Sequence, residues 1–223
     1  MMERMLTFEQ IKADPEVIAF ITQADKVMEA IGFTKHGARH VSHVAKTARK
    51  LLRDLGYHER TCELAAIAGL LHDMGNAINR TNHAQSSACL ANMILGRLDM
   101  DQTEKAEVVT AIGNHHEEDG SPVSPISAAL ILADKSDVHR YRVRTPESLK
   151  LDIHDRVNYA VTKSWLVVTR DDATITLDLT VDTNIASVME YFEIFMPRTL
   201  ISRKAADFLG FRFALILNGT RMV

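Results

Sequence analysis

The chain has 223 residues and a formal net charge of −3. Its hydrophobic fraction of 46% and charged fraction of 25% are ordinary for a folded globular protein, and its small negative charge gives no electrostatic reason to expect nucleic acid or an anionic membrane as the main partner. No apolar stretch reaches the ~20 residues of a membrane-spanning helix, and the N-terminus lacks the apolar core of a signal peptide, so we expect a cytoplasmic protein.

The first three quarters of the chain has the apolar periodicity of helices. Asp14 and Pro15 resemble a helix start, and Gly32 and Gly56 follow apolar segments as stop signals. His36 and His40 are four residues apart and would share a helical face if their helix already includes His36. We expect one or two helices over about 7–31 and single helices over about 34–55, 58–71, 83–98, 101–116 and 125–137. A basic extended stretch at 141–146 and a further helix over 146–161 should follow.

From Lys163 onward the pattern changes to that of strands. The segments 165–169 and 174–181 are rich in β-branched residues, and the short polar turn between them predicts a β-hairpin. A long helix over about 185–209 should follow, with a third strand at 211–217. The sequence therefore predicts a mainly α fold with two parts: a helical body over 1–162, and a small C-terminal α+β extension over 163–223.

A histidine and an aspartate stand side by side at the end of the third helical segment. His72 and Asp73 follow a buried apolar run, where two polar groups are costly unless they are paired or bind a metal. Imidazole and carboxylate together suit Fe, Mn, Zn, Co or Ni. Further candidates lie at or near other helix ends, as in ligand sites built from facing helices: His40, His83, His115, His116 and Asp134.

In this order, H…HD…H…H…D, the residues over about 33–145 resemble the HD-domain superfamily of metal-dependent phosphohydrolases. The resemblance implies an HD-type helical bundle in which His40, His72, Asp73 and Asp134 are the core metal ligands. It also implies that His83 and His115 belong to a two-metal site in which Asp73 bridges the ions.

The turn after the fifth segment resembles the cyclic-dinucleotide HD-GYP branch. The residues His115-His116-Glu117 match the start of the motif of that branch. This resemblance implies that His116 is a metal ligand, and that His36 either binds a third metal or supports the ligands through a hydrogen bond. The chain departs from the branch where the GYP tripeptide would stand, at Ser121-Pro122-Val123, and it has Asn76 in place of the lysine of HDxGK. These departures argue against a cyclic-dinucleotide substrate.

The ligand set predicts hydrolysis of a phosphate ester or nucleotide. Two divalent cations ~3.5–4 Å apart can lower the pKa of a water so that it attacks as hydroxide near neutral pH. Fe, Mn, Ni or Co are the expected metals, with Zn or Mg as alternatives. We expect Asp73 and Lys135 to act in catalysis, with Lys135, Arg142 and Arg144 binding the substrate phosphate. A phosphorylated small molecule or nucleotide is the expected partner, with a homodimer as a further expectation.

Three other functions compete with this prediction. A mixed-valent di-iron oxygenase on the same scaffold should purify with iron and consume oxygen. A cyclic-dinucleotide phosphodiesterase is disfavoured by the missing GYP tripeptide. A non-catalytic HD signalling module would be expected to have lost most of its ligands, whereas this chain has them all.

Overall fold

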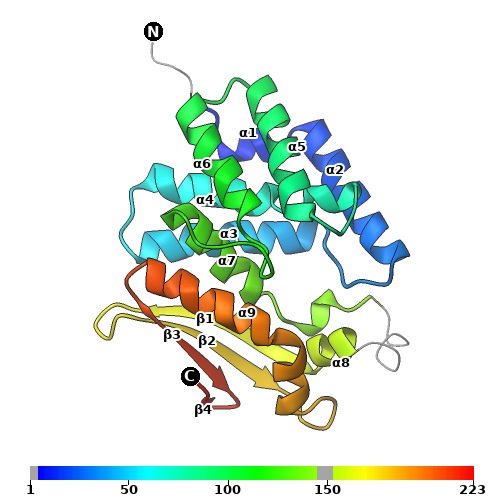
Figure 1. The fold of residues 1–223 in the computed structure, drawn as a ribbon, viewed down its shortest axis with the longest axis vertical. Helices are drawn as coiled ribbons and strands as arrows, with labels where there is room; N and C mark the ends of the chain where they lie inside the picture. The colour runs from blue at the N-terminus through cyan, green and yellow to red at the C-terminus, as the bar shows by residue number, and fades with distance from the viewer. Residues whose placement is uncertain (1–4, 145–152) are drawn as a thin grey trace.

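The computed structural model describes residues 5–144 and 153–223. Within them the helices are α1 (Phe8–Lys12), α2 (Pro15–Ala30), α3 (Ala38–Asp54), α4 (Glu59–Leu71), α5 (His83–Arg97), α6 (Gln102–Gly113), α7 (Pro125–Ser136), α8 (Ile153–Ala160) and α9 (Val188–Phe208), with 3₁₀ turns η1 (Met74–Ala77) and η2 (Arg140–Arg142). The strands are β1 (Val161–Thr169), β2 (Thr174–Val181), β3 (Arg212–Leu217) and β4 (Thr220–Arg221). The predicted mainly α class is confirmed (Figure 1).

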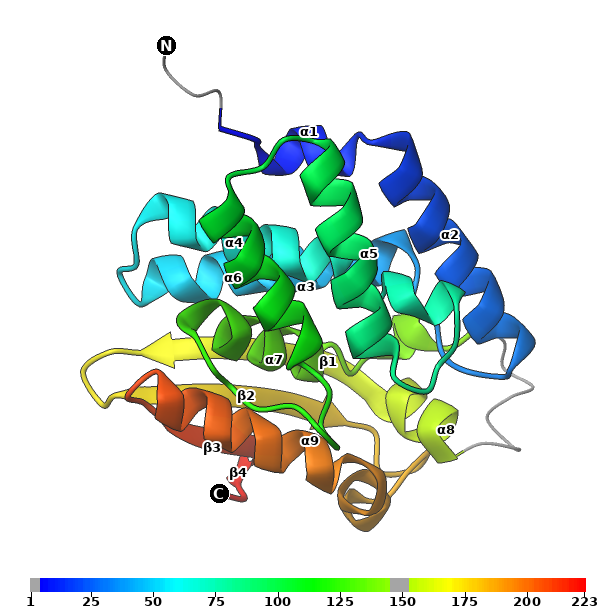
Figure 2. The same cartoon turned by 45° about the horizontal axis from the view of Figure 1, so that its top comes forward.

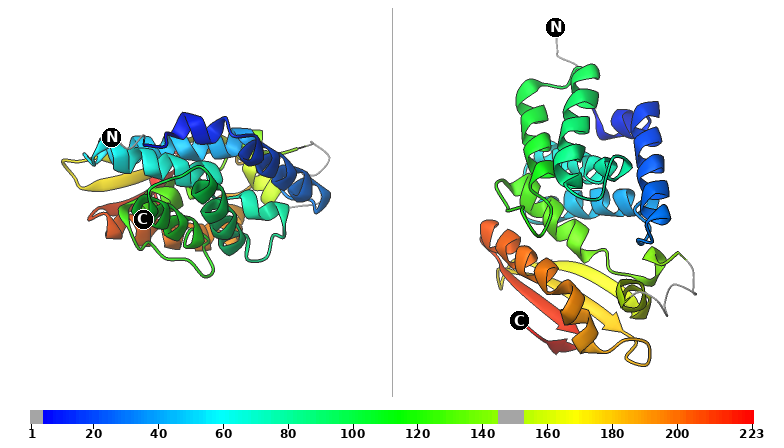
Figure 3. Two further views of the ribbon diagram at one scale, coloured as in Figure 1. Left: turned by 90° about the horizontal axis from the view of Figure 1, so that it is seen from above. Right: turned by 45° about the vertical axis from the view of Figure 1, so that its right-hand side comes forward.

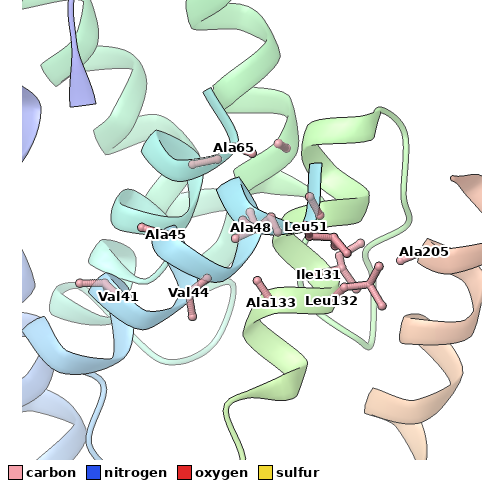
Figure 4. Packing of buried hydrophobic residues seen from close by; sticks show 14 of the residues in the cluster. Val41, Val44, Ala45, Ala48, Leu51, Ala65, Ile131, Leu132, Ala133 and Ala205 are labelled. Atoms are coloured by element: carbon pink, nitrogen blue, oxygen red, sulfur yellow. The ribbon is translucent and has the colours of Figure 1, made fainter. Parts of the chain in front are cut away.

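The centre of the helical body is formed by α3, α4 and α7, which pack against one another. Figure 4 shows Val44 and Ala48 of α3 and Ala133 of α7 among the buried side chains of this region. The two helices α3 and α4 approach closely at Gly69, where an added Cβ would lie 2.8 Å from the Cα of Ala45. Close packing here fixes the C-terminal end of α4, and with it the residues that follow.

Local sequence signals explain most helix starts. The Asp14 carboxylate accepts hydrogen bonds from the backbone N–H groups of Glu16 and Val17, with Pro15 in the first turn of α2. Ser124 forms a capping box at the start of α7, and the Asp101 side chain caps α6. These contacts satisfy backbone donors that a helix start otherwise leaves unpaired.

The strands form one sheet in the order β1-β2-β3-β4. The antiparallel pairing of β1 with β2 confirms the predicted hairpin, and the third strand is present as β3. Because β2 and β3 run parallel, the chain must cross over between them, and α9 makes this crossover. Short β4 then folds back on β3.

Helix α9 lies between strands β2 and β3 and the helical body, whereas β1 contacts α3 and α7 directly. The helix contacts β2 and β3 on one side and α7 on the other, as Figures 1 and 2 show in two orientations. Tyr191 and Phe195 of α9 are almost completely buried. The right-hand view of Figure 3 shows the same layers, with the sheet outermost. The C-terminal segment is therefore packed onto the helical body.

The structure corrects three details of the expected elements. Helix α3 begins at Ala38, so His36 precedes it and does not share a helical face with His40. Helix α6 ends at Gly113, which places His115 and His116 in the following turn. The stretch expected to be extended contains η2 instead. The start of the helix expected at Pro146 lies outside the described residues, and among those described no helix combines the length and apolarity that crossing a membrane requires.

Candidate metal centre

The candidate ligands come from the ends of five helices. His40 lies in the first turn of α3, and Asp134 lies in the last turn of α7. His72 and Asp73 directly follow α4, and the remaining members begin α5 or follow α6. Helix ends that converge on one point explain how residues up to about a hundred positions apart become neighbours: His40, His72, Asp73, His83, His115 and Asp134.

The two carboxylates form the centre of the cluster. Asp73 Oδ2 lies 3.4 Å from Nε2 of His40 and 3.4 Å from Nε2 of His72. Its other oxygen, Oδ1, lies 3.6 Å from Nε2 of His83. Asp134 Oδ1 lies 3.4 Å and 3.6 Å from the same His40 and His72 nitrogens. One carboxylate thus has a histidine nitrogen near each of its oxygens, which suits a bridging ligand.

The opposite ring nitrogen of each histidine is held by an acceptor on the protein. Nδ1 of His72 is 2.9 Å from the Gly69 carbonyl oxygen, and Nδ1 of His40 is 2.7 Å from Asp137 Oδ2. Three further Nδ1 atoms have backbone carbonyl partners, those of His36, His83 and His115. For His72 and His115, a carbonyl partner on Nδ1 favours the tautomer in which Nε2 is available as a metal donor. His40 Nδ1 is also contacted by Arg142, and Nε2 of His83 lies 3.4 Å from an Arg80 nitrogen.

The donor set fits divalent metal ions. Ligand atoms of His40, His72 and Asp134 lie within 4.8 Å of one another, as do those of His72, Asp73 and His115. The two groups share His72, and neither contains a cysteine. Nε2 of His72 is buried, and its contacts with Asp73 at 3.4 Å and Asp134 at 3.6 Å do not have hydrogen-bond geometry. A buried nitrogen without a partner is costly, and a metal ion bound there would remove that cost.

The electrostatics of the cluster keep its carboxylates ionised. Although burial opposes it, the neighbouring His72 imidazole holds the pKa of Asp73 well below its usual range. Lys135 has the same effect on the pKa of Asp134, again against the effect of burial. Burial lowers the pKa of His83 to about 4 and that of His115 well below its usual value, so both imidazoles are neutral at pH 7. Neutral imidazole and ionised carboxylate are the forms that bind metals.

Two predicted phosphate contacts have protein partners instead. The Arg142 guanidinium is buried and donates to Asp137 at 3.1 Å and to His36 Nε2 at 3.1 Å. Arg144 pairs with Asp25 at 2.7 Å and donates to the backbone of Phe33. A guanidinium on His36 Nε2 places positive charge where a third metal ion would bind. The roles predicted for these side chains in phosphate and third-metal binding stay predictions.

Lys135 and His116 lie beside the cluster. Lys135 is 5% exposed, and its Nζ lies 2.7 Å from Asp134 Oδ2 and 2.5 Å from Glu117 Oε2. The His116 ring contacts the His83 ring at 4.8 Å between centroids, and both histidines lie outside the two metal groups. Its Nδ1 lies 3.4 Å from Asp119 Oδ1. Metal binding by His116 and catalysis by Lys135 likewise stay predictions.

A cavity of about 720 Å³ lies next to the cluster. His36, His83 and His116 line one side of it, and Arg198 of α9 lines another. Phe33 and Arg80 also contribute, with the Arg80 guanidinium over the Phe33 ring at 5.5 Å from its centroid. The volume is sufficient for a nucleotide-sized ligand.

Sequence reasoning missed several side chains that support the site. Asn76 donates to Asp73 Oδ1 at 2.8 Å and to the Asp73 carbonyl, which fixes the carboxylate. Glu117 holds Lys135, and Arg198 comes from a segment in which the sequence indicated no chemistry. The signals available were weak: Asn76 follows Asp73 by three residues, and Glu117 directly follows the histidine pair.

Comparison with known proteins gives one family match. The family model for the HD domain matches residues 37–159, more than half of the chain. A ribonuclease Y from Aster yellows witches'-broom phytoplasma is 34% identical over 107 residues, which cover 47% of this chain and 18% of that protein. A ribonuclease Y from Onion yellows phytoplasma is 31% identical over 138 residues, covering 56% of this chain and 24% of that protein.

A third relative is nearer to this chain in length. It is an uncharacterized protein from Methanocaldococcus jannaschii, 28% identical over 173 residues, which cover 67% of this chain and 66% of that protein. The chain thus spans under a quarter of each of the two ribonucleases. The matched region contains every candidate ligand from His40 to Asp134.

Proposed function

Because the chain belongs to the HD-domain superfamily of metal-dependent phosphohydrolases, we propose that it hydrolyses a phosphate ester or nucleotide at a centre of two divalent metal ions. The observation that carries this proposal is the convergence of histidine Nε2 atoms on Asp73 and Asp134, with each Nδ1 held by an acceptor behind it. The proposed ligands are His40, His72, Asp73, His83, His115 and Asp134, with Asp73 shared by both ions.

The bound metals would neutralise charge on the phosphoryl oxygens and lower the pKa of a water nucleophile. The side chains of the chain do the positioning. Asn76 holds the Asp73 carboxylate, and Asp137 holds the His40 ring. Lys135 keeps a positive charge beside Asp134. A fixed arrangement of charges of this kind stabilises a phosphoryl-transfer transition state without reorganising during the reaction.

The donor set also bears on which metals bind. Four imidazoles and two carboxylates suit Fe, Mn, Ni, Co or Zn better than Mg or Ca, which prefer oxygen donors. We propose Fe, Mn, Ni or Co as the native metals. We also propose that residues 1–162 form the metal-binding domain and 163–223 an extension whose helix α9 completes the cavity.

RNA is a second candidate substrate. The relatives named ribonuclease Y favour it, although this chain spans a small part of their length and its net charge of −3 gives no general attraction to nucleic acid. A short RNA end would need only the cavity beside the metals. The cyclic-dinucleotide, oxygenase and non-catalytic alternatives have no observation in the structure that favours them.

The proposal is tested by turnover. We expect the metal-loaded protein to release nitrophenol or phosphate from at least one of nitrophenyl phosphate, bis-nitrophenyl phosphate, a nucleotide set and a short RNA. Asp134→Asn should lower that rate by about a hundredfold or more, because mutating a residue that only orients a ligand already costs roughly 10–100-fold. His58→Ala, at an exposed position outside the site, is the matched control. Oxygen uptake without hydrolysis would overturn the proposal in favour of the oxygenase.

A further inference from the structure

Helix α9 brings one cation to the cavity beside the metal centre. Arg198 lines this cavity, and it belongs to a segment that lies outside the region matched by the HD-domain model. Its guanidinium carbon lies 4.7 Å from the centroid of the Phe195 ring on the preceding turn. Phe195 is almost completely buried, so this cation–π contact restricts the direction of the guanidinium.

Arg198 is only partly neutralised. Its Nε lies 3.4 Å from Glu117 Oε1, which is its one polar contact within the part of the chain that the structure describes. Glu117 is already the partner of Lys135, at 2.5 Å. One carboxylate thus serves two cations. The guanidinium has five N–H donors, so four of them have no acceptor among the described residues.

The position of Arg198 relative to the metal centre follows from this chain of contacts. Asp134 pairs with Lys135, Lys135 with Glu117, and Glu117 with Arg198. Three successive ion pairs therefore connect Arg198 to Asp134, which is a proposed metal ligand. An anion bound there would be separate from the phosphoryl group at the metals but could belong to the same molecule.

We propose that Arg198 binds a second phosphate of the substrate, so that the preferred substrates are nucleotides with two phosphates joined through one sugar. This inference rests on the proposed function for the placement of the first phosphate. An arginine fork matches two oxygens of a phosphate, and four of the five N–H donors of Arg198 have no acceptor among the described residues. Arg80 over Phe33 adds a planar guanidinium at the cavity wall, a surface on which a nucleobase can stack.

The test compares two ligands that differ by one phosphate. Thymidine 3′,5′-bisphosphate and thymidine 5′-monophosphate are titrated calorimetrically into the metal-loaded protein at 4 °C, with phosphate release followed so that only intact ligand is counted. We expect the bisphosphate to bind wild type about tenfold more tightly, and Arg198→Met to remove that advantage while leaving monophosphate affinity unchanged. Arg198→Lys should keep part of the advantage, because it keeps the charge but not the fork.

Arg203→Met is the matched control. Arg203 is an exposed arginine on the same helix, about 140° further round, and it lines a different, apolar cavity. It should retain the bisphosphate advantage in full. The metal content and the midpoint of thermal unfolding of each variant show whether Arg198→Met acts through the metal centre or the fold. If Arg198→Met loses metal or thermal stability to an extent that explains its weaker binding, the assignment of Arg198 is overturned.

Failure of the inference can be told apart from failure of the proposed function. No bisphosphate advantage in wild type, or equal loss of both ligands in Arg198→Met, overturns the second-phosphate site even if phosphoesters are hydrolysed. An Arg198-dependent advantage in a protein that hydrolyses nothing would support the binding site and overturn the hydrolase. A 5′-phosphorylated dinucleotide shows whether the substrate is an oligonucleotide or a mononucleotide. If the dinucleotide binds more tightly than the bisphosphate, the substrate is an oligonucleotide; if it binds more weakly, the substrate is a mononucleotide.

Discussion

The histidines of the metal centre differ in the proton they carry. Burial lowers the pKa values of His83 and His115, so both are neutral at pH 7. For His72 and His40, nearby carboxylates outweigh the effect of burial and raise the pKa. Burial opposes protonation of His72, but the Asp73 carboxylate beside it outweighs burial and raises the pKa of His72 to about 10. In the metal-free protein at pH 7, His72 is therefore an imidazolium paired with two carboxylates. A metal ion must displace this proton in order to bind.

Proton release on metal binding follows from this. Adding Mn²⁺ to metal-free protein at pH 7 should release at least one proton per chain, because the pKa values of His72 and His40 are both raised. The apparent affinity should rise at least about tenfold per pH unit while His72 stays protonated. The direction is fixed because His72 loses its proton only as the pH passes through about 10. An indicator dye in weak buffer measures the release.

The matched comparison for this titration uses two single histidine variants. His58→Ala removes an exposed histidine that caps α4 and should release as many protons as wild type. His72→Ala should release about one proton fewer and bind metal more weakly. Metal binding by the wild-type chain without any proton release would contradict the protonation state assigned to His72.

Also at the scale of residues, the sequence indicated the histidines and aspartates of the site but missed the asparagine, glutamate and arginine that support them. The order of histidines and aspartates, which resembles that of HD domains, indicated side chains that lie close together in the fold. Their role as metal ligands stays a prediction. Asn76, Glu117 and Arg198 carry no such signal. An arginine on an amphipathic helix is by default a solvated residue, and only the packing of α9 on α7 brings Arg198 to the cavity.

At the scale of elements, the approach of α3 to α4 sets the position of His72 and Asp73. Gly69 permits that approach, because a Cβ there would lie 2.8 Å from the Cα and 2.9 Å from the N of Ala45. These are backbone atoms, so relief would require the helices to move apart. Small shifts at Gly69 would also move the carbonyl that holds His72 Nδ1.

Gly69→Ala should therefore lower the free energy of unfolding by about 1–3 kcal/mol, the usual cost of overpacking a core, and weaken metal retention as well. Gly96→Ala is the matched control, since Gly96 also lies in a helix but an added Cβ meets only the end of Lys105 at 3.5 Å. That variant should gain up to about 1 kcal/mol from helix propensity. Urea unfolding of both measures the difference, and equal stabilities would contradict the close-packing argument.

Elements were predictable where a local signal marked their ends. Asp14 with Pro15, Asp101 and the strand hairpin all form as the sequence indicates. The start of α3 was placed too early because residues 34–37 have no apolar side chain that would show whether they belong to the helix. Gly37 precedes the helix, and a Cβ there would lie 2.9 Å from the Asp25 side chain. The two-residue strand β4 is too short to give a periodic signal.

At the scale of the whole molecule, the C-terminal extension contributes part of the lining of the cavity beside the metal centre. Helix α9 is held between the sheet and α7 (Figure 3). Residues from both parts of the chain therefore line the cavity. The sequence predicted the extension and its elements, but not its role at the cavity. Docking of this kind depends on which face of α9 meets α7, and the long helix is apolar on more than one side.

The metal content of the purified and reconstituted chain, measured by elemental analysis, tests the central claim most directly. We expect about two equivalents of a transition metal in wild type. Asp73→Asn should lose most of it, because Asp73 has a histidine nitrogen near each oxygen. His58→Ala should keep the wild-type amount. A chain that binds no metal after reconstitution, or an Asp73→Asn variant with the full complement, would contradict the account.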